Sequence, residues 1–304
     1  CYPPGGGKTE TASQAMVNAA CGVAENSAAA GYRCWFVVHR RTLVRQTSAR
    51  LTKYGIRHGV IMSGEQQSPM EKIQVVSLDT VHSRFFKKDA KWKDNPPMHP
   101  DLLIYDEAHT RTSMFEEVRK QLRYTWLIGL TATPSAPVGK TMRDLGYEQI
   151  VYGPKTSWLI ENNYLVGARY FAPEAYDYSG VRINKATGEF VESSADGIVD
   201  KPELIGNLVQ NYIELGEDRP FVVFANSVAH SRHITQRFCD AGIPCAHIDC
   251  KVDNDRREEL FQEVRDGRIR GLSNYGILDR GFDLEILSVC ILARKFRNLA
   301  TYIQ

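Results

Sequence analysis

Residues 3–9 read Pro-Pro-Gly-Gly-Gly-Lys-Thr, and a helical pattern of small and apolar residues follows at once. Glycines let backbone N–H groups approach phosphate oxygens closely, and the start of a helix adds partial positive charge. A lysine can neutralise the outer phosphates of a nucleotide, and a hydroxyl can hold Mg²⁺. The strict phosphate-loop pattern has glycine at the position that Tyr2 occupies, so the match is imperfect. Taken alone, this stretch could also be a glycine-rich turn that binds no ligand.

Residues 102–109 read Leu-Leu-Ile-Tyr-Asp-Glu-Ala-His. The unbroken apolar run is typical of a strand that is buried on both faces of a parallel sheet. Asp106, at the carboxyl end of this strand, is placed to hold Mg²⁺ beside the phosphate loop, and Glu107 can orient or deprotonate an attacking water. The alternative is an exposed acidic turn that caps the next helix. After a phosphate loop, the spacing favours a nucleotide site.

Short apolar runs alternate with helical patterns along the whole chain, which predicts an α/β fold with parallel sheets. In the first half we expect strands at 34–38, 59–62, 73–77, 102–105 and 126–130, with helices at 9–29 and 42–53. In the second half we expect strands at 220–224, 244–248, near Leu272 and at 289–292, with helices at 228–241 and 255–266. Residues 152–163 are expected to be a connector, and residues 173–199 a hairpin or loop.

The motifs resemble those of a known family. Gly-Lys-Thr at 7–9, Asp-Glu-Ala-His at 106–109 and Thr-Ala-Thr-Pro at 131–134 follow the order of the motifs of superfamily 2 helicases and translocases. The second half continues the resemblance at residues 221–231, 247–269 and 274–283. In detail the chain is most similar to the DEAH-type group that includes RadD-like repair helicases and the ATPase subunits of type III restriction enzymes.

This resemblance implies two tandem RecA-like domains, at residues 1–156 and 157–304, with ATP and Mg²⁺ bound in the cleft between them. It implies an ATP-dependent helicase or translocase that moves along a nucleic-acid strand, with DNA favoured over RNA and little dependence on base sequence. The alternative is a non-unwinding motor or a nucleotide-gated clamp in a restriction or repair complex. Whether a nuclease or methylase acts as its partner stays open.

The resemblance also implies roles for individual residues. Lys8, Asp106, Glu107 and His109 would be catalytic, with Thr9 and Asp106 holding Mg²⁺. Nucleotide contacts would come from Pro4, Gly5, Gly6, Gly7, Lys8, Thr9, Glu10, Gly281 and Asp283. Nucleic-acid contacts would come from Arg40, Arg41, Gln46, Ser77 and Thr80, and coupling from Thr131 and Thr133. For the arginines, a solvated start of a helix is the alternative.

The composition narrows the classes of protein further. The 304 residues are 43% hydrophobic and 24% charged, the ordinary mixture of a globular domain, and no apolar run reaches the length of about 18 residues that a membrane span needs. The seven cysteines are scattered and form no CxxC pair, which favours reduced thiols and a cytoplasmic location. Because the chain starts at the phosphate loop and stops at Gln304, the resemblance further implies a fragment of a longer helicase with weak ATPase activity.

Overall fold

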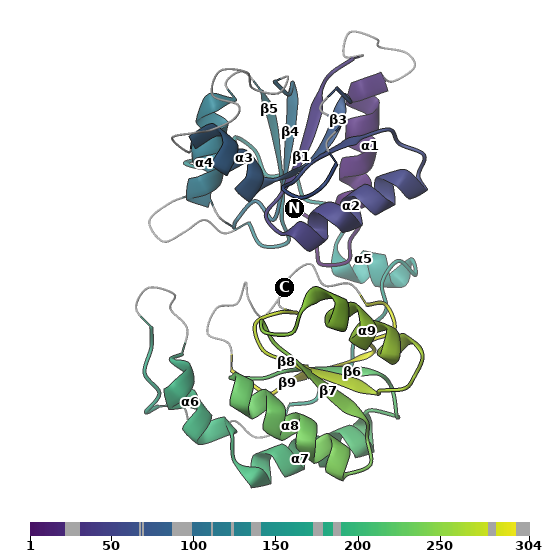
Figure 1. Cartoon of the computed structure of the whole chain (residues 1–304), viewed down its shortest axis with the longest axis vertical. Helices are drawn as coiled ribbons and strands as arrows, with labels where there is room; N and C mark the ends of the chain where they lie inside the picture. Colours follow the sequence, from purple (N-terminus) through teal and green to yellow (C-terminus); the bar gives the residue numbers. More distant parts are fainter. Residues whose placement is uncertain are drawn as a thin grey trace. The chain divides into compact units, whose positions relative to one another are not determined.

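The computed structural model divides into two compact units, Cys1–Arg169 and Tyr170–Gln304 (Figure 1). The first unit extends past the domain boundary expected at residue 156, and the side chain of Leu165 lies against Gly5 of the phosphate loop. The structure describes residues 1–21, 31–66, 68, 70–86, 99–110, 112–122, 125–134, 141–172, 179–184, 190–278 and 284–295.

The first unit is built on a five-stranded parallel sheet with the strand order β2-β3-β1-β4-β5. Its strands are β1 (Cys34–Val38), β2 (Gly59–Ile61), β3 (Ile73–Ser77), β4 (Leu102–Asp106) and β5 (Trp126–Leu130). Every residue of β1, β3 and β4 is buried, whereas β5 lies at the edge and buries only Leu130. The unbroken apolar runs therefore predicted these central strands correctly.

Helices cover both faces of this sheet. The helices are α1 (Lys8–Cys21), α2 (Arg41–Lys53), α3 (Leu78–Phe86) and α4 (Thr112–Gln121). Phe36 and Ile104 pack with Met16 of α1, while the alternate residues Trp35 and Tyr105 pack in a separate cluster with α3 and α4. Figure 1 shows α1 and α2 on one side of the sheet and α3 and α4 on the other. This alternation explains why apolar residues fill every position of β1 and the first four positions of β4.

The strand order changes direction beside β1, because β2 and β3 lie on one side of β1 and the chain then crosses to β4 and β5 on the other side. Open parallel sheets bind their ligands at the carboxyl ends of the strands near such a reversal. Helix α1 packs against both β1 and β4, so its first turn lies at this position. The fold thus places the phosphate loop where ligand binding is expected.

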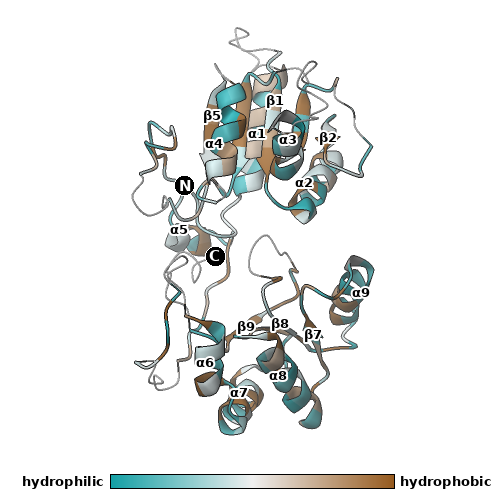
Figure 2. Cartoon of the chain, turned by 60° about the vertical axis from the view of Figure 1, so that its left-hand side comes forward, coloured by the Kyte–Doolittle hydropathy of each residue, from teal (hydrophilic) through white to brown (hydrophobic). Residues whose placement is uncertain are grey.

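The second unit has a four-stranded parallel sheet with the order β7-β8-β6-β9. The strands are β6 (Phe221–Phe224), β7 (Cys245–Ile248), β8 (Gly271–Asn274) and β9 (Val289–Leu292), and the helices are α7 (Pro202–Leu215), α8 (Val228–Asp240) and α9 (Asn254–Arg265). Helices α7 and α8 pack against one face of the sheet, and α9 packs against the other. Figure 2 shows hydrophobic residues gathered on the strands and hydrophilic residues along α8 and α9.

Two short helices correct the sequence-based expectations. The expected connector contains α5 (Thr156–Glu161), in which Leu159 is buried. The stretch expected to be a hairpin or loop contains α6 (Glu192–Val199), whose buried residues are Ala195 and Val199. An isolated antiparallel bridge between Ile183 and Phe190 precedes α6, while the turn expected at 185–189 lies outside the described residues. Each of these helices has two buried side chains or fewer.

All seven cysteines carry free thiols, as their scattered positions predicted. Burial raises the pKa of the Cys34 thiol to about 12, so this thiol is protonated and packs as a small apolar group. In the described part of the chain, every helix is too short or too polar to cross a bilayer.

Candidate active site

The phosphate loop is held in a shape that glycine adopts most easily. The N–H of Gly6 donates to the carbonyl of Pro3 at 3.0 Å, which closes a turn. Gly5 and Gly7 have φ angles of +69° and +86°, in the left-handed region. Helix α1 begins at the next residue, Lys8, so the loop leads directly into the positive end of a 14-residue helix. This is the cradle that a phosphate group requires.

A backbone hydrogen bond fixes the loop beside the edge of the sheet. The N–H of Tyr2 donates to the carbonyl of Thr131 at 3.0 Å, just after the end of β5. Strand β5 pairs with β4 in a register that places Leu130 opposite Asp106. The phosphate loop, the end of β4 and the end of β5 therefore meet at one place on the carboxyl edge.

Asp106 is a buried carboxyl group with 9% of its surface exposed. Burial raises its pKa, while the charge of Lys8 and a hydrogen bond from the N–H of Glu107 act in the opposite direction. The N–H of Glu107 lies 3.0 Å from Oδ1 of Asp106. A desolvated carboxylate beside one lysine is stabilised by a further cation, and this is the environment that suits a Mg²⁺ ligand.

Glu107 differs from Asp106 in its backbone conformation and in the exposure of its side chain. Its backbone is in the left-handed region, at a φ of +53°, which is costly for a residue with a Cβ. Its carbonyl accepts hydrogen bonds from the N–H and the hydroxyl of Thr110, at 2.8 and 2.9 Å, and these bonds hold the turn. Its side chain is 19% exposed, more than that of Asp106, so one carboxylate can bind a metal while the other meets water.

His109 connects the acidic turn to the end of β5. Its Nδ1 lies 2.8 Å from Oγ1 of Thr131 and 3.5 Å from Oε2 of Glu107. The hydroxyl of Thr131 donates its single hydrogen to the carbonyl of Thr133 at 2.9 Å, so Nδ1 of His109 must be the donor in its bond to Thr131. The N–H of Thr133 donates back to Oγ1 of Thr131 at 3.0 Å. A continuous chain of hydrogen bonds thus runs from the acidic turn to the segment after β5.

These residues fit a nucleotide with Mg²⁺. Among the described residues, no group of three or more His, Cys, Asp and Glu side chains is placed to hold a metal by itself. Mg²⁺ needs no such group, because it is usually bound by one or two carboxylates together with phosphate oxygens and waters. Thr9 and Asp106 would supply the protein ligands, and Lys8 the charge for the outer phosphates. Glu10 lies apart from them in an ion pair with Arg50 of α2, at 3.1 Å.

The residues expected to contact nucleic acid lie after the carboxyl end of β1 and at or just after the carboxyl end of β3. Arg40 precedes the first residue of α2, and Gln46 is exposed on this helix. The guanidinium of Arg41 donates to the carbonyl of Ser63 at 2.9 Å, and the N–H of Ser63 donates to Oγ1 of Thr80 at 3.2 Å. Arg41 and Thr80 are therefore brought together, although 39 positions separate them in the sequence.

Ser63 is the residue that sequence reasoning missed. It follows β2 by two residues, in a turn that includes Gly64, and its position near a strand end was the available signal. Ser77 is buried at the end of β3, where its hydroxyl accepts from the N–H of Thr80 at 3.4 Å. Thr80 thus holds the turn at Ser63, and Ser77 in turn holds the backbone of Thr80. Gly281 and Asp283 lie outside the described residues.

Comparisons with known proteins agree with this arrangement. The family described as type III restriction enzyme, res subunit, matches residues 2–136, and the helicase conserved C-terminal domain matches residues 200–304. The chain carries a superfamily 2 helicase core. Both units of this core are RecA-like α/β domains with parallel sheets, as the sequence predicted.

The helicase core is similar to proteins of several origins. It is 26% identical to a 51.5 kDa protein of a Lactococcus phage, over 99% of this chain and 60% of that protein. It is 23% identical to the DNA 3'-5' translocase XPB2 of Sulfurisphaera tokodaii, over 88% of this chain and 66% of that protein. A fragment structure described as an HsdR subunit of a type I restriction enzyme, from Vibrio vulnificus, superposes with a TM-score of 0.67 at 15% identity. That superposition covers 99% of this chain and 54% of the other. The chain thus spans less than two thirds of each of these proteins.

The burial of Asp106 predicts a gain in stability when its charge is removed. Because burial raises the pKa of Asp106, the wild type loses stability as the pH rises from the ordinary value of 3.8 through the raised pKa. We expect Asp106→Asn to raise the thermal midpoint of the nucleotide-free chain at pH 7, by a few degrees at most, since 1 kcal/mol shifts a domain of this size by about 2–4 °C. Thermal unfolding followed by circular dichroism measures the effect.

The matched control is Glu161→Gln, which removes an exposed carboxylate from α5 and should leave the midpoint unchanged. Below pH 3.8 the difference between Asp106→Asn and the wild type should vanish, because both side chains are then uncharged. A lower midpoint for Asp106→Asn than for the wild type at pH 7 would contradict the account of this carboxylate.

Proposed function

We propose that this protein hydrolyses ATP to move along a nucleic-acid strand, and that the strand is DNA. One observation carries the proposal. A single edge of the first sheet bears both the nucleotide residues, at the ends of β4 and β5, and the Arg41–Ser63–Thr80 contact, after the ends of β1, β2 and β3. Because both groups of residues lie on one edge, a structural change at the nucleotide residues can reach the Arg41–Ser63–Thr80 contact through few intervening residues. The similarity to a protein named as a DNA translocase and to the restriction enzyme family supports DNA.

In this proposal each residue of the nucleotide half has a separate task. Lys8 neutralises charge on the outer phosphates, and Thr9 and Asp106 hold Mg²⁺, which when bound stabilises the charge that develops during phosphoryl transfer. The carboxylate of Glu107 orients the attacking water and accepts its proton. His109 passes the state of the site to Thr131, because its Nδ1 proton bonds the hydroxyl of that residue.

Lys8→Ala and Glu107→Gln should separate nucleotide binding from hydrolysis. We expect Lys8→Ala to abolish turnover and weaken ATP binding, because the charge on the outer phosphates is left without its partner. Glu107→Gln should keep ATP binding and lower hydrolysis by a factor of about 10² or more, through loss of the general base. A fluorescent ATP analogue measures binding, and phosphate release measures hydrolysis. Turnover above a few per cent of wild type in Lys8→Ala, or equal losses of affinity in both variants, would argue against these roles.

Arg41→Ala should weaken DNA binding to a similar degree for all base sequences. Loss of one phosphate contact lowers the slope of log affinity against log salt by about 0.7–0.9. Arg57→Ala is the matched control, because Arg57 precedes β2 at the opposite edge of the sheet, where it pairs with Glu71 at 2.8 Å. Fluorescence anisotropy with a labelled single strand, titrated across salt concentrations, measures both variants. An unchanged slope in Arg41→Ala would contradict a phosphate contact by Arg41. It would favour the alternative, in which Arg41 is a solvated residue at the start of α2.

The same assay tests the choice of nucleic acid. Unlabelled DNA and RNA strands of one sequence are compared as competitors for the labelled strand. Tighter binding of the RNA strand would contradict DNA as the track, while leaving a role in nucleic-acid movement intact.

A further inference from the structure

Helix α6 presents a row of carboxylates to the rest of the second unit. Glu192, Asp196 and Asp200 recur every fourth residue along α6 and its carboxyl end, so they lie on one face. The hydroxyl of Tyr275 donates to Oε1 of Glu192. Nδ2 of Asn226 donates to Oδ1 of Asp196 at 2.8 Å. These contacts hold α6 against the unit through its acidic face.

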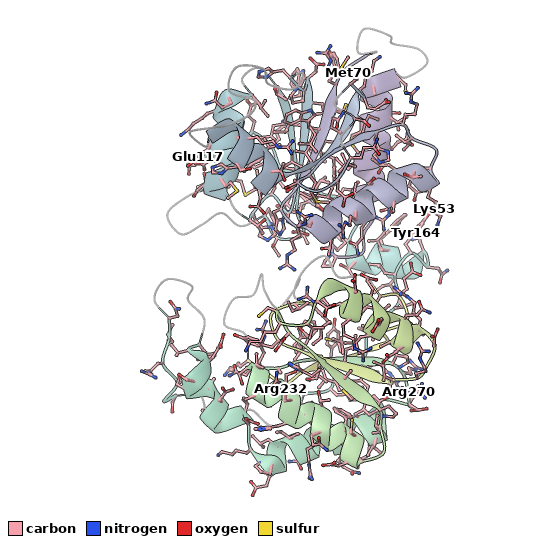
Figure 3. All side chains as sticks on the ribbon, in the orientation of Figure 1. Lys53, Met70, Glu117, Tyr164, Arg232 and Arg270 are labelled. Atoms are coloured by element: carbon pink, nitrogen blue, oxygen red, sulfur yellow. The ribbon has the colours of Figure 1, made fainter. Side chains whose placement is uncertain are left out.

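The third carboxylate follows the same pattern. Oδ1 of Asp200 lies 2.9 Å from Nδ1 of His233, on α8. Arg232, which Figure 3 labels near the start of α8, precedes His233 and is exposed. The guanidinium of Arg232 approaches Asp249 only to 3.9 Å, too far for a hydrogen bond. The surface under and beside α6 is therefore rich in hydrogen-bond donors.

These donors lie at the edge of the sheet where ligands bind. Asn226 follows β6 by two residues, Tyr275 follows β8 directly, and the two strands are neighbours with Phe224 opposite Asn274. Helix α8 starts at the same edge, where the side chain of Ser227 accepts the N–H of His230 as an N-cap. The carboxyl edge of a parallel sheet is the usual place for a ligand, and here a helix of the same chain covers it.

The donors under α6 suit an anion, and α6 uses them. Asn226 has an exposed fraction of 8%, and both hydrogens of its amide are used, by Asp196 and by the carbonyl of Glu192 at 3.1 Å. An amide, a phenol hydroxyl and an imidazole also bond the phosphate oxygens of a nucleic-acid backbone. While α6 is in place, Asn226 has no hydrogen left to donate to a phosphate.

We propose that α6 is an intramolecular competitor of nucleic acid, whose carboxylates take the place of backbone phosphates at Asn226, Tyr275 and His233. This inference rests on the proposed function, because it assumes that the protein binds a nucleic-acid strand. Displacement of α6 frees the three donors and leaves Arg232 beside them.

The helix is weak enough to be displaced. It has eight residues, fewer than the 12–15 or so at which isolated helices become even marginally stable, and Val191 at its N-cap provides no side-chain hydrogen bond. Gly197 lies in its interior, where glycine destabilises a helix relative to alanine. Only Ala195 and Val199 are buried. The contacts of the carboxylates therefore contribute much of what holds α6 in place.

The test removes the competitor and measures DNA affinity with the full chain. Glu192→Ala combined with Asp196→Ala should bind a labelled single strand more tightly by a factor of about five or more, the lower end of ordinary coupling between sites. The control is Glu203→Ala combined with Glu214→Ala, which removes two exposed carboxylates from α7 and so makes the same change in net charge. All measurements use one salt concentration, and circular dichroism verifies folding.

A second variant tests the idea in the opposite direction without changing any charge. An added Cβ at Gly197 meets no atom within 4 Å, so Gly197→Ala should strengthen α6 and weaken DNA binding. Equal affinities of the α6 and α7 double variants, or weaker binding by the α6 double variant, would overturn the competitor role and make α6 a support for Asn226. Absence of binding by the wild type and every variant would overturn the proposed function itself.

Discussion

Parallel pairing of β4 with β5 is the constraint on which the candidate site depends. The register places Asp106 opposite Leu130, so the acidic turn after one strand and Thr131 after the other must emerge side by side. The hydrogen bond from Ala108 N–H to the carbonyl of Leu130, at 2.9 Å, continues this pairing beyond the strands. A slip of one residue would turn Asp106 to the other face of the sheet and separate His109 from Thr131.

The same edge contains a buried carboxyl group, that of Asp106. Asp106 is held in a place that raises its pKa, which makes the nucleotide-free site less stable than it need be. Burial on both faces of the sheet keeps the carboxylate fixed, since Tyr105 before it stacks on Phe115 at 3.9 Å between ring centroids. A site of this kind gives up stability for a preformed geometry, and a bound cation would recover what the burial costs.

The sequence was sufficient to predict the strands of both sheets, and it singled out residues 3–9 and 106–109 as a nucleotide site, which stays a prediction. Apolar runs such as 34–38 and 102–105 have few alternatives to a buried strand, and a Gly-Lys-Thr before a helix has a recognisable chemistry. Helices α3, α4 and α7 were not among the expected helices, and neither were α5 and α6. Helices α5 and α6 are short, and Gly197 with the neighbouring polar residues made α6 resemble a loop.

Contacts between residues that are far apart in the sequence could not be predicted from it either. Arg41 with Ser63, and Asp196 with Asn226, depend on which strand ends become neighbours, and no local pattern records that. The motif residues Gly281 and Asp283 lie outside the described residues, so their part in nucleotide binding stays a prediction.

In the proposed function, His109 and Thr131 connect the nucleotide half of the edge to the nucleic-acid half. A double-mutant cycle of His109→Ala and Thr131→Val tests it, with ATP hydrolysis measured in the presence and absence of single-stranded DNA. We expect each single variant to lose the DNA-stimulated increase over its own basal rate, and the double variant to lose no more of that increase than either single variant. Unchanged stimulation in the single variants, or losses that multiply in the double variant, would contradict it.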